Sequence, residues 1–140
     1  MKLFLDTEFN GFGGSLLSMA LVPENSSLEF YREINFSGQL DPWVRDNVVP
    51  KLVLQPISYA KFQSDLAEYL WAMGECTIVA DWPDDIKYFC EALITGPGQR
   101  FSFTPNIKFE LDFGIEYESN APHNALEDAR GIKEFYLRRV

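Results

Sequence analysis

Histidine and cysteine are scarce in this chain of 140 residues. It has a single histidine, His123, and two cysteines, Cys76 and Cys90, which form no CxxC pair. A structural zinc site usually takes four such ligands, so a zinc finger is excluded. Two isolated thiols within apolar segments predict buried, reduced cysteines and a cytoplasmic protein.

Positive charge is also in short supply. The chain has 12 lysines and arginines against 21 aspartates and glutamates, which gives a formal net charge of −9. Proteins that hold long nucleic acid by charge alone are basic, so that class is excluded. A site that binds metal through carboxylates is compatible with this balance, because such a site is acidic until cations arrive.

Long apolar runs are missing as well. None approaches the roughly 18 residues of a membrane span, and the opening residues MKLFLDTEFNG lack the apolar stretch of a secretory signal. We therefore expect no membrane association. The chain does contain 46% hydrophobic and 15% aromatic residues, enough for one well-packed core. This composition predicts a single domain over residues 1–140.

Hydrophobic periodicity predicts alternating strands and helices. Strands are expected at 2–9, 15–23, 28–36, 76–80 and 100–107, followed by an irregular stretch at 108–122. A short helix is expected from Pro42, with Asp41 as its cap, and a longer one from Ser58 to Gly74. A third is expected up to Gly96, with Ile86, Phe89, Cys90 and Leu93 on one face. The last helix is expected over 124–140, with Asn124 and Glu127 as a capping box and these residues toward the core: Leu126, Ala129, Ile132, Phe135, Tyr136 and Leu137. The element order predicts an α/β fold. It is the ribonuclease H-like order, a mixed sheet of about five strands with helices packed on it.

Two carboxylates lie close together on the first expected strand. Asp6 and Glu8 stand two residues apart, so their side chains point to the same face. Charged residues are mostly exposed, and a solvated face is therefore the alternative interpretation. The apolar flank Leu3–Leu5 and the following Gly11 favour a paired-carboxylate metal site instead.

A third carboxylate is expected from the helix that follows the buried fourth strand. The carboxyl end of a central strand, next to a helix N-terminus, is where open α/β sheets place their ligands. Asp81 and Asp84 compete with Asp85 for this position, and helix capping is the alternative role of all three. We favour Asp85 because Ile86 and Phe89 then face the core.

His123 and Asp128 mark the start of the last expected helix. His123 lies just before the helix cap, and Asp128 lies one turn inside the helix. This spacing places an imidazole, a group that titrates near neutral pH, beside a helix-borne carboxylate. A lone histidine is more often structural, so this pair gains weight only together with the other acidic residues.

Together and in this order, these motifs resemble the DEDDh 3′–5′ exonuclease superfamily, which includes ribonuclease T and oligoribonuclease. The motifs are Asp6-Thr7-Glu8-Phe9-Asn10-Gly11, Asp81-x-x-x-Asp85 and His123-Asn124-Ala125-Leu126-Glu127-Asp128-Ala129, and they span nearly the whole chain. The segment Pro42-Trp43-Val44-Arg45-x-x-Val48-x-x-Lys51-Leu52 is similar to a family of small, stand-alone bacterial 3′–5′ exoribonucleases. Relatives often carry Asn where Asp81 stands, so no role is transferred to that residue.

The resemblance implies a metal-dependent 3′–5′ exoribonuclease that releases 5′-mononucleotides from RNA 3′ ends. Two Mg²⁺ or Mn²⁺ ions would be bridged by Asp6, with Glu8, Asp85 and Asp128 completing their shells. His123 would be the general base for the attacking water. The alternatives are the same site acting on DNA or short oligonucleotides, and a non-catalytic protein–protein module that retains the fold.

Substrate contacts are expected next to the first strand and next to the fourth. Phe9, Trp82 and Trp43 are candidates for stacking on a base, and Asn10 for a hydrogen bond to the ribose 2′-hydroxyl. Core packing is the alternative for Phe9, and an interface or core anchor is the alternative for Trp82 and Trp43. Ribonuclease T and oligoribonuclease are homodimers, so a homodimer is expected here, with the aromatic segment 28–36 and the Trp43 arm suited to its interface.

Overall fold

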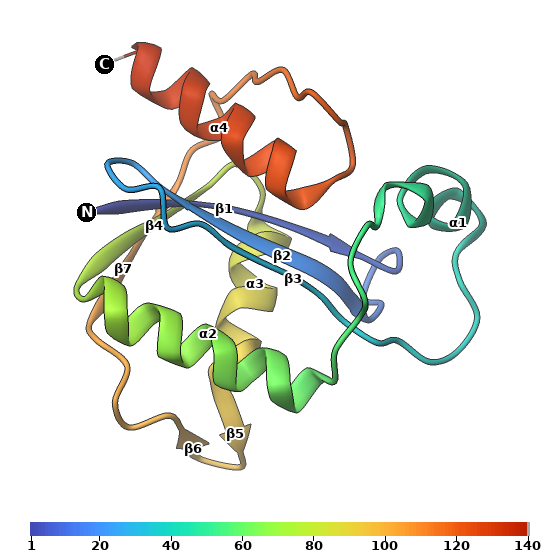
Figure 1. Cartoon of the computed structure of the whole chain (residues 1–140), viewed down its shortest axis with the longest axis horizontal. Coiled ribbons are helices and arrows are strands. Elements are labelled where there is room, and N and C mark those ends of the chain that lie inside the picture. Colours follow the sequence, from blue (N-terminus) through green and yellow to red (C-terminus); the bar gives the residue numbers. More distant parts are fainter. Residues whose placement is uncertain (140) are drawn as a thin grey trace.

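The protein is built on a five-stranded mixed sheet with helices on both faces (Figure 1). The structure is a computed structural model and describes residues 1–139. The strands of this sheet are β1 (Lys2–Phe9), β2 (Leu16–Pro23), β3 (Phe30–Glu33), β4 (Cys76–Ala80) and β7 (Ile107–Leu111). The helices are α1 (Pro42–Asn47), the short 3₁₀ helix η1 (Val49–Lys51), α2 (Tyr59–Met73), α3 (Pro83–Ala92) and α4 (Ala125–Arg139). None of the helices in this described part is long and apolar enough to cross a membrane.

The strand order in the sheet is β3-β2-β1-β4-β7. The first three strands form an antiparallel meander, and β4 and β7 add to the other side of β1 in parallel. Short turns suffice for the meander, whereas each parallel strand needs a crossover, which α2 and α3 supply. The predicted α/β class and the ribonuclease H-like arrangement are confirmed.

Strand alternation sends the side chains of β1 to two different cores. Leu3 and Leu5 pack with Phe62 and Phe89 of α2 and α3 on one face of the sheet. Phe4 packs with α4 residues on the other face, the arrangement seen in Figure 1, where α4 lies opposite α2 and α3. Asp6 has the same parity as Phe4, so the sheet directs its carboxylate toward α4.

The predicted helix caps are confirmed. Ser58 accepts a hydrogen bond from the Lys61 backbone N–H, and Asp41 accepts from the backbone N–H groups of Trp43 and Val44. α2 ends at Gly74, whose φ of 79° suits a residue without a Cβ. These local signals are strong because each one satisfies backbone groups that the helix itself leaves unpaired.

The prediction of a strand at 100–107 is wrong, as is that of an irregular stretch from residue 108. The sheet strand is β7, Ile107–Leu111, while β5 (Ile94–Gly96) and β6 (Gln99–Arg100) form a separate small hairpin. Pro105 has no N–H for a ladder, and the apolar side chains of Phe101 and Phe103 pack against each other instead. Pairing with β4 sets the strand position from outside the segment.

Three other elements differ from their predictions, either in their bounds or in which residues face the core. The third strand covers only Phe30–Glu33, and α3 ends at Ala92, before Gly96. Leu137 of α4 is exposed rather than buried, and the charged Glu127 binds Arg130 instead of completing a capping box. Asn124 does cap α4, because its side chain accepts from the Glu127 N–H. Residue 140, also predicted to be helical, lies outside the described residues.

Candidate metal centre

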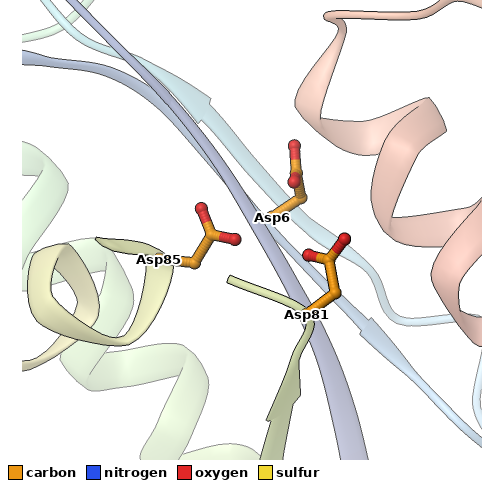
Figure 2. Close-up of side chains that lie close together, drawn as sticks. All are labelled: Asp6, Asp81 and Asp85. Atoms are coloured by element: carbon orange, nitrogen blue, oxygen red, sulfur yellow. The ribbon is translucent and has the colours of Figure 1, made fainter. Parts of the chain in front are cut away.

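Five carboxylates from four segments of the chain converge at one end of the sheet. They are Asp6 and Glu8 of β1, Asp81 just after β4, Asp85 of α3 and Asp128 of α4. They form two groups of three, Asp6–Asp81–Asp85 and Asp6–Glu8–Asp128, and within each group one oxygen per residue lies within 4.8 Å of the others. Asp6 belongs to both groups. Figure 2 shows the first group, with its three side chains gathered around β1.

The parallel pairing of β1 with β4 brings the first group together. Phe4 is level with Val79, so Asp81 emerges from the end of β4 beside Asp6. α3 starts directly afterwards and carries Asp85 in its first turn. The Thr7 hydroxyl, on β1, donates a 2.6 Å hydrogen bond to Asp85 Oδ1 and holds that carboxylate in place.

The second group depends on how α4 crosses the sheet. α4 packs along β1 and β2, with Ala125 and Ala129 against Ala20 and Val22. These small side chains allow a close approach, which brings Asp128 over β1. Gly131 allows a second close contact, between α4 and the segment that precedes it, because a Cβ there would lie 2.3 Å from the Glu118 carbonyl oxygen.

Burial makes this convergence of negative charge unfavourable. Burial raises the pKa of Asp6 well above its ordinary value, and the charges of Asp85 and Glu8 raise it further. Burial and the neighbouring Asp128 raise the pKa of Glu8 to about 9, and burial raises that of Asp85 to about 7. Asp81 and Asp128 also have raised pKa values, again mainly because they are buried.

The buried oxygens of this cluster fit a hard divalent cation. Asp6 Oδ2 and Asp128 Oδ1 are buried without any hydrogen-bond partner, and an unpaired buried acceptor is costly. Carboxylate oxygens with no nitrogen or sulfur donor among them suit Mg²⁺ or Mn²⁺. All four acids expected as ligands, Asp6, Glu8, Asp85 and Asp128, lie in the cluster.

The structure also distinguishes the three neighbouring aspartates that the sequence left in competition. Asp85 is buried in the cluster, whereas Asp84 is partly exposed and accepts a hydrogen bond from Trp82 Nε1 at 3.2 Å. Asp81, to which no role was given from the sequence, joins Asp85 in the first group. Asp81 stands at the end of a strand parallel to β1, which places it beside Asp6. This placement can be recognised only once the register between β1 and β4 is known.

His123 lies at the edge of the cluster in a strained conformation. Its φ is 72°, in the left-handed region that few residues other than glycine adopt. Its backbone N–H donates to Asp128 Oδ2 at 3.1 Å, so the strained loop is fastened to the cluster. The imidazole packs edge-on against Trp43, with ring centroids 5.0 Å apart.

A cavity of about 290 Å³ opens beside Glu8. Most of its wall is aromatic or apolar, and the lining residues are Glu8, Phe9, Gly11, Phe12, Asp41, Trp43, Val44, Val48, Trp82 and Asp84. Trp43, Trp82 and Phe12 are exposed large aromatics, whereas Phe9 stacks on Tyr88 at 4.8 Å. Three predicted substrate residues, Phe9, Trp82 and Trp43, thus line one cavity next to the carboxylates.

Asn10, the other residue predicted to contact substrate, is engaged elsewhere. Its side-chain amide donates to the Gln39 carbonyl at 3.0 Å and accepts from the Asp41 N–H at 2.8 Å. Asn10 is not among the residues that line the cavity. In this arrangement its side chain fastens the segment before α1 to the turn after β1.

Comparison with protein-family models, with curated proteins and with solved structures found no match to this chain. Its function is therefore inferred from the carboxylate cluster and the cavity themselves.

Crowding of the carboxylates predicts that the metal-free protein loses stability as pH rises. Folding raises the pKa of Glu8 from 4.5 to about 9 and that of Asp85 from 3.8 to about 7. The folded protein therefore holds these protons more tightly, and this contribution to stability is complete below about pH 4 and lost as pH rises toward 9. Urea unfolding in EDTA should show that wild type weakens relative to Asp6→Asn between about pH 5 and pH 8.5. Asp84→Asn is the matched control and should keep the wild-type slope; an Asp6→Asn difference that is constant with pH would contradict the prediction.

A divalent cation should offset that repulsion. Mn²⁺ or Mg²⁺ at about a hundredfold excess over its Kd should stabilise the fold by about 2.7 kcal/mol, because it binds only the folded state. We expect Asp6→Asn to lose most of this gain in thermal melts and Asp81→Asn to lose part of it. Asp84→Asn should respond as wild type does. A melting temperature that ignores millimolar cation in the wild-type protein would reject the metal centre.

Proposed function

We propose that the protein is a metal-dependent 3′–5′ exoribonuclease. The observation that supports this most directly is that Asp6 belongs to two carboxylate groups beside a cavity lined with aromatic side chains. A shared carboxylate between two oxygen-ligand sets suits a pair of divalent cations, and paired cations are typical of phosphodiester hydrolysis. The aromatic wall suits a nucleobase.

The carboxylates have separate positions in this proposal. Glu8 and Asp128 belong with Asp6 to one ligand set, and Asp81 and Asp85 to the other. Two cations held by these residues would supply activation of a water molecule and stabilisation of the leaving oxygen of an in-line displacement. The Thr7 hydroxyl keeps Asp85 oriented, so that its remaining oxygen stays directed to the cluster.

His123 is the proposed general base. Its loop is joined to the cluster by the bond between its backbone N–H and Asp128, and Trp43 limits the positions that its ring can take. A base must lie within reach of the proton that it takes, so a restrained imidazole beside the cluster is suited to this task. The proton would pass from the attacking water to the imidazole.

The size of the cavity supports action at a chain end. The turn after β1, which carries Phe9, Gly11 and Phe12, forms part of its wall. About 290 Å³ of space is comparable to the size of one nucleoside. The formal charge of −9 also favours a short contact with the nucleic acid over a long electrostatic footprint.

Strands labelled at the 5′ end should shorten stepwise from the 3′ end. With Mn²⁺ and single-stranded RNA we expect a ladder and 5′-mononucleotide products, weaker cleavage of the matching DNA, and none of RNA that carries a 3′-phosphate. Asp6→Asn should be inactive while still folded, and Asp84→Asn should stay active. Equal rates on DNA would remove the preference for RNA, cuts within a circular strand would overturn exonuclease action, and inactivity on every strand would favour the non-catalytic module.

The His123→Ala variant separates proton transfer from metal binding. We expect its turnover to fall by about 10²–10⁴-fold, because a positioned base contributes that much, while Mn²⁺ still raises its melting temperature as in wild type. A variant that keeps the wild-type rate would show that another group takes the proton.

A further inference from the structure

One edge of the main sheet is partly closed by the chain itself, at the end of β3. Beside β3, Ile34 bridges to Ile57, the Asn35 N–H donates to the Ile57 carbonyl at 2.8 Å, and the Ile57 N–H donates to the Glu33 carbonyl at 3.0 Å. Phe30 is only 1% exposed. Within the segment 28–36, expected from the sequence to suit a dimer interface, Phe30, Glu33 and Ile34 are buried, whereas Leu28 and Phe36 are exposed.

The opposite edge is open. β7 is the last strand in the order of the sheet and pairs only with β4 among the described residues. The Asp112 N–H donates to the Ala80 carbonyl, on the β4 side. Because backbone groups of successive strand residues point to opposite sides, Lys108 and Glu110 also direct theirs to β4. The backbone groups of Ile107, Phe109 and Leu111 are left pointing outward.

Those outward groups allow only a few ways to pair with a second copy. Two identical strands related by a two-fold axis run antiparallel. If the axis passes at Phe109, this residue faces its own copy, Ile107 faces Leu111, and all the outward groups are paired. Axes at Lys108 or at Glu110 also use outward groups, but they place lysine opposite lysine or glutamate opposite glutamate.

Charge selects among these registers. With the axis at Phe109, Lys108 of each copy lies opposite Glu110 of the other, at positions where cross-strand side chains are closest. Within one copy the Glu110 carboxylate is partly exposed and lies against the Tyr136 hydroxyl of α4, whose pKa it raises, and Lys108 is exposed. The sequence Ile-Lys-Phe-Glu-Leu is thus complementary to itself in one register and repels itself in its neighbours.

The apolar face of β7 is also unusually exposed for a strand. Phe109 is 43% and Leu111 is 37% exposed, although Phe109 touches Phe89 of the core. Long, apolar, open edges are normally blocked by charge, bulges or a covering segment. In β7 the two charges stand where they would attract a second copy rather than repel it.

We propose that β7 is a dimer interface, through which two copies of this chain pair antiparallel about Phe109 and form one continuous sheet. The Lys108–Glu110 pairs set the register, and Phe109 and Leu111 become covered. This interface does not depend on the proposed nuclease activity, because none of the five clustered carboxylates belongs to β7.

Sedimentation velocity of the full-length chain tests this directly, at concentrations from a few to about one hundred micromolar. We expect a species of twice the 16.1 kDa chain mass. Lys108→Glu should weaken the dimer by about tenfold or more, because it replaces two attractive pairs with two repulsive ones. The double variant Lys108→Glu/Glu110→Lys should restore it. Lys87→Glu, the same charge change on α3, should leave the dimer intact.

Hydrogen exchange gives a readout that needs no variant. The amides of 107–111 in the wild-type chain should exchange more slowly at high concentration than after dilution, so the test survives if Glu110→Lys prevents folding. A monomer at every concentration would overturn the proposal and leave the edge open to a strand from another protein. A dimer that Lys108→Glu does not weaken, or whose 107–111 amides exchange independently of concentration, would place the interface elsewhere.

Discussion

The burial of several carboxylates at one point, with repulsion among them added, is the constraint on which the functional end of this molecule depends. Five acids meet there, and the resulting raised pKa values show that the folded chain carries their charge at a cost. The cost is tolerable only with protons or cations among the oxygens. The parity of β1, the register between β1 and β4 and the close approach of α4 all serve to bring these groups together.

The segment between β3 and α2 links this cluster to the cavity beside it. Glu33 is buried and accepts hydrogen bonds from the backbone N–H groups of Val53 and Leu54, which anchors the later part of this segment. The Asn124 side chain donates a hydrogen bond to the Lys51 carbonyl at 3.0 Å, so the same segment is also attached to the start of α4. Trp43 then both lines the cavity and touches His123. A ligand in the cavity would thus contact a residue that restrains the imidazole.

The two edges of the sheet differ in how far other parts of the chain cover them. β3 is short, the segment that follows it bridges to Ile34 at its end, and Phe30 packs in the core against Phe62 and Tyr69 of α2. β7 ends the sheet on the other side and keeps exposed apolar side chains between two opposite charges. An open edge is a liability unless something pairs with it, and a self-complementary strand is suited to its own copy.

Local patterns in the sequence determined the elements whose reasons are local, such as the Ser58 and Asp41 caps, the Gly74 stop and the alternation of β1 that puts Asp6 and Glu8 on one face. The α/β order followed from those elements. Only tertiary structure decided the position of β7, because pairing with β4 outweighed the apolar pattern at 100–107. It also decided that Asp81 joins the cluster and that Asn10 holds the segment before α1. Contacts between residues far apart in the chain depend on register and helix crossing, which a linear pattern does not contain.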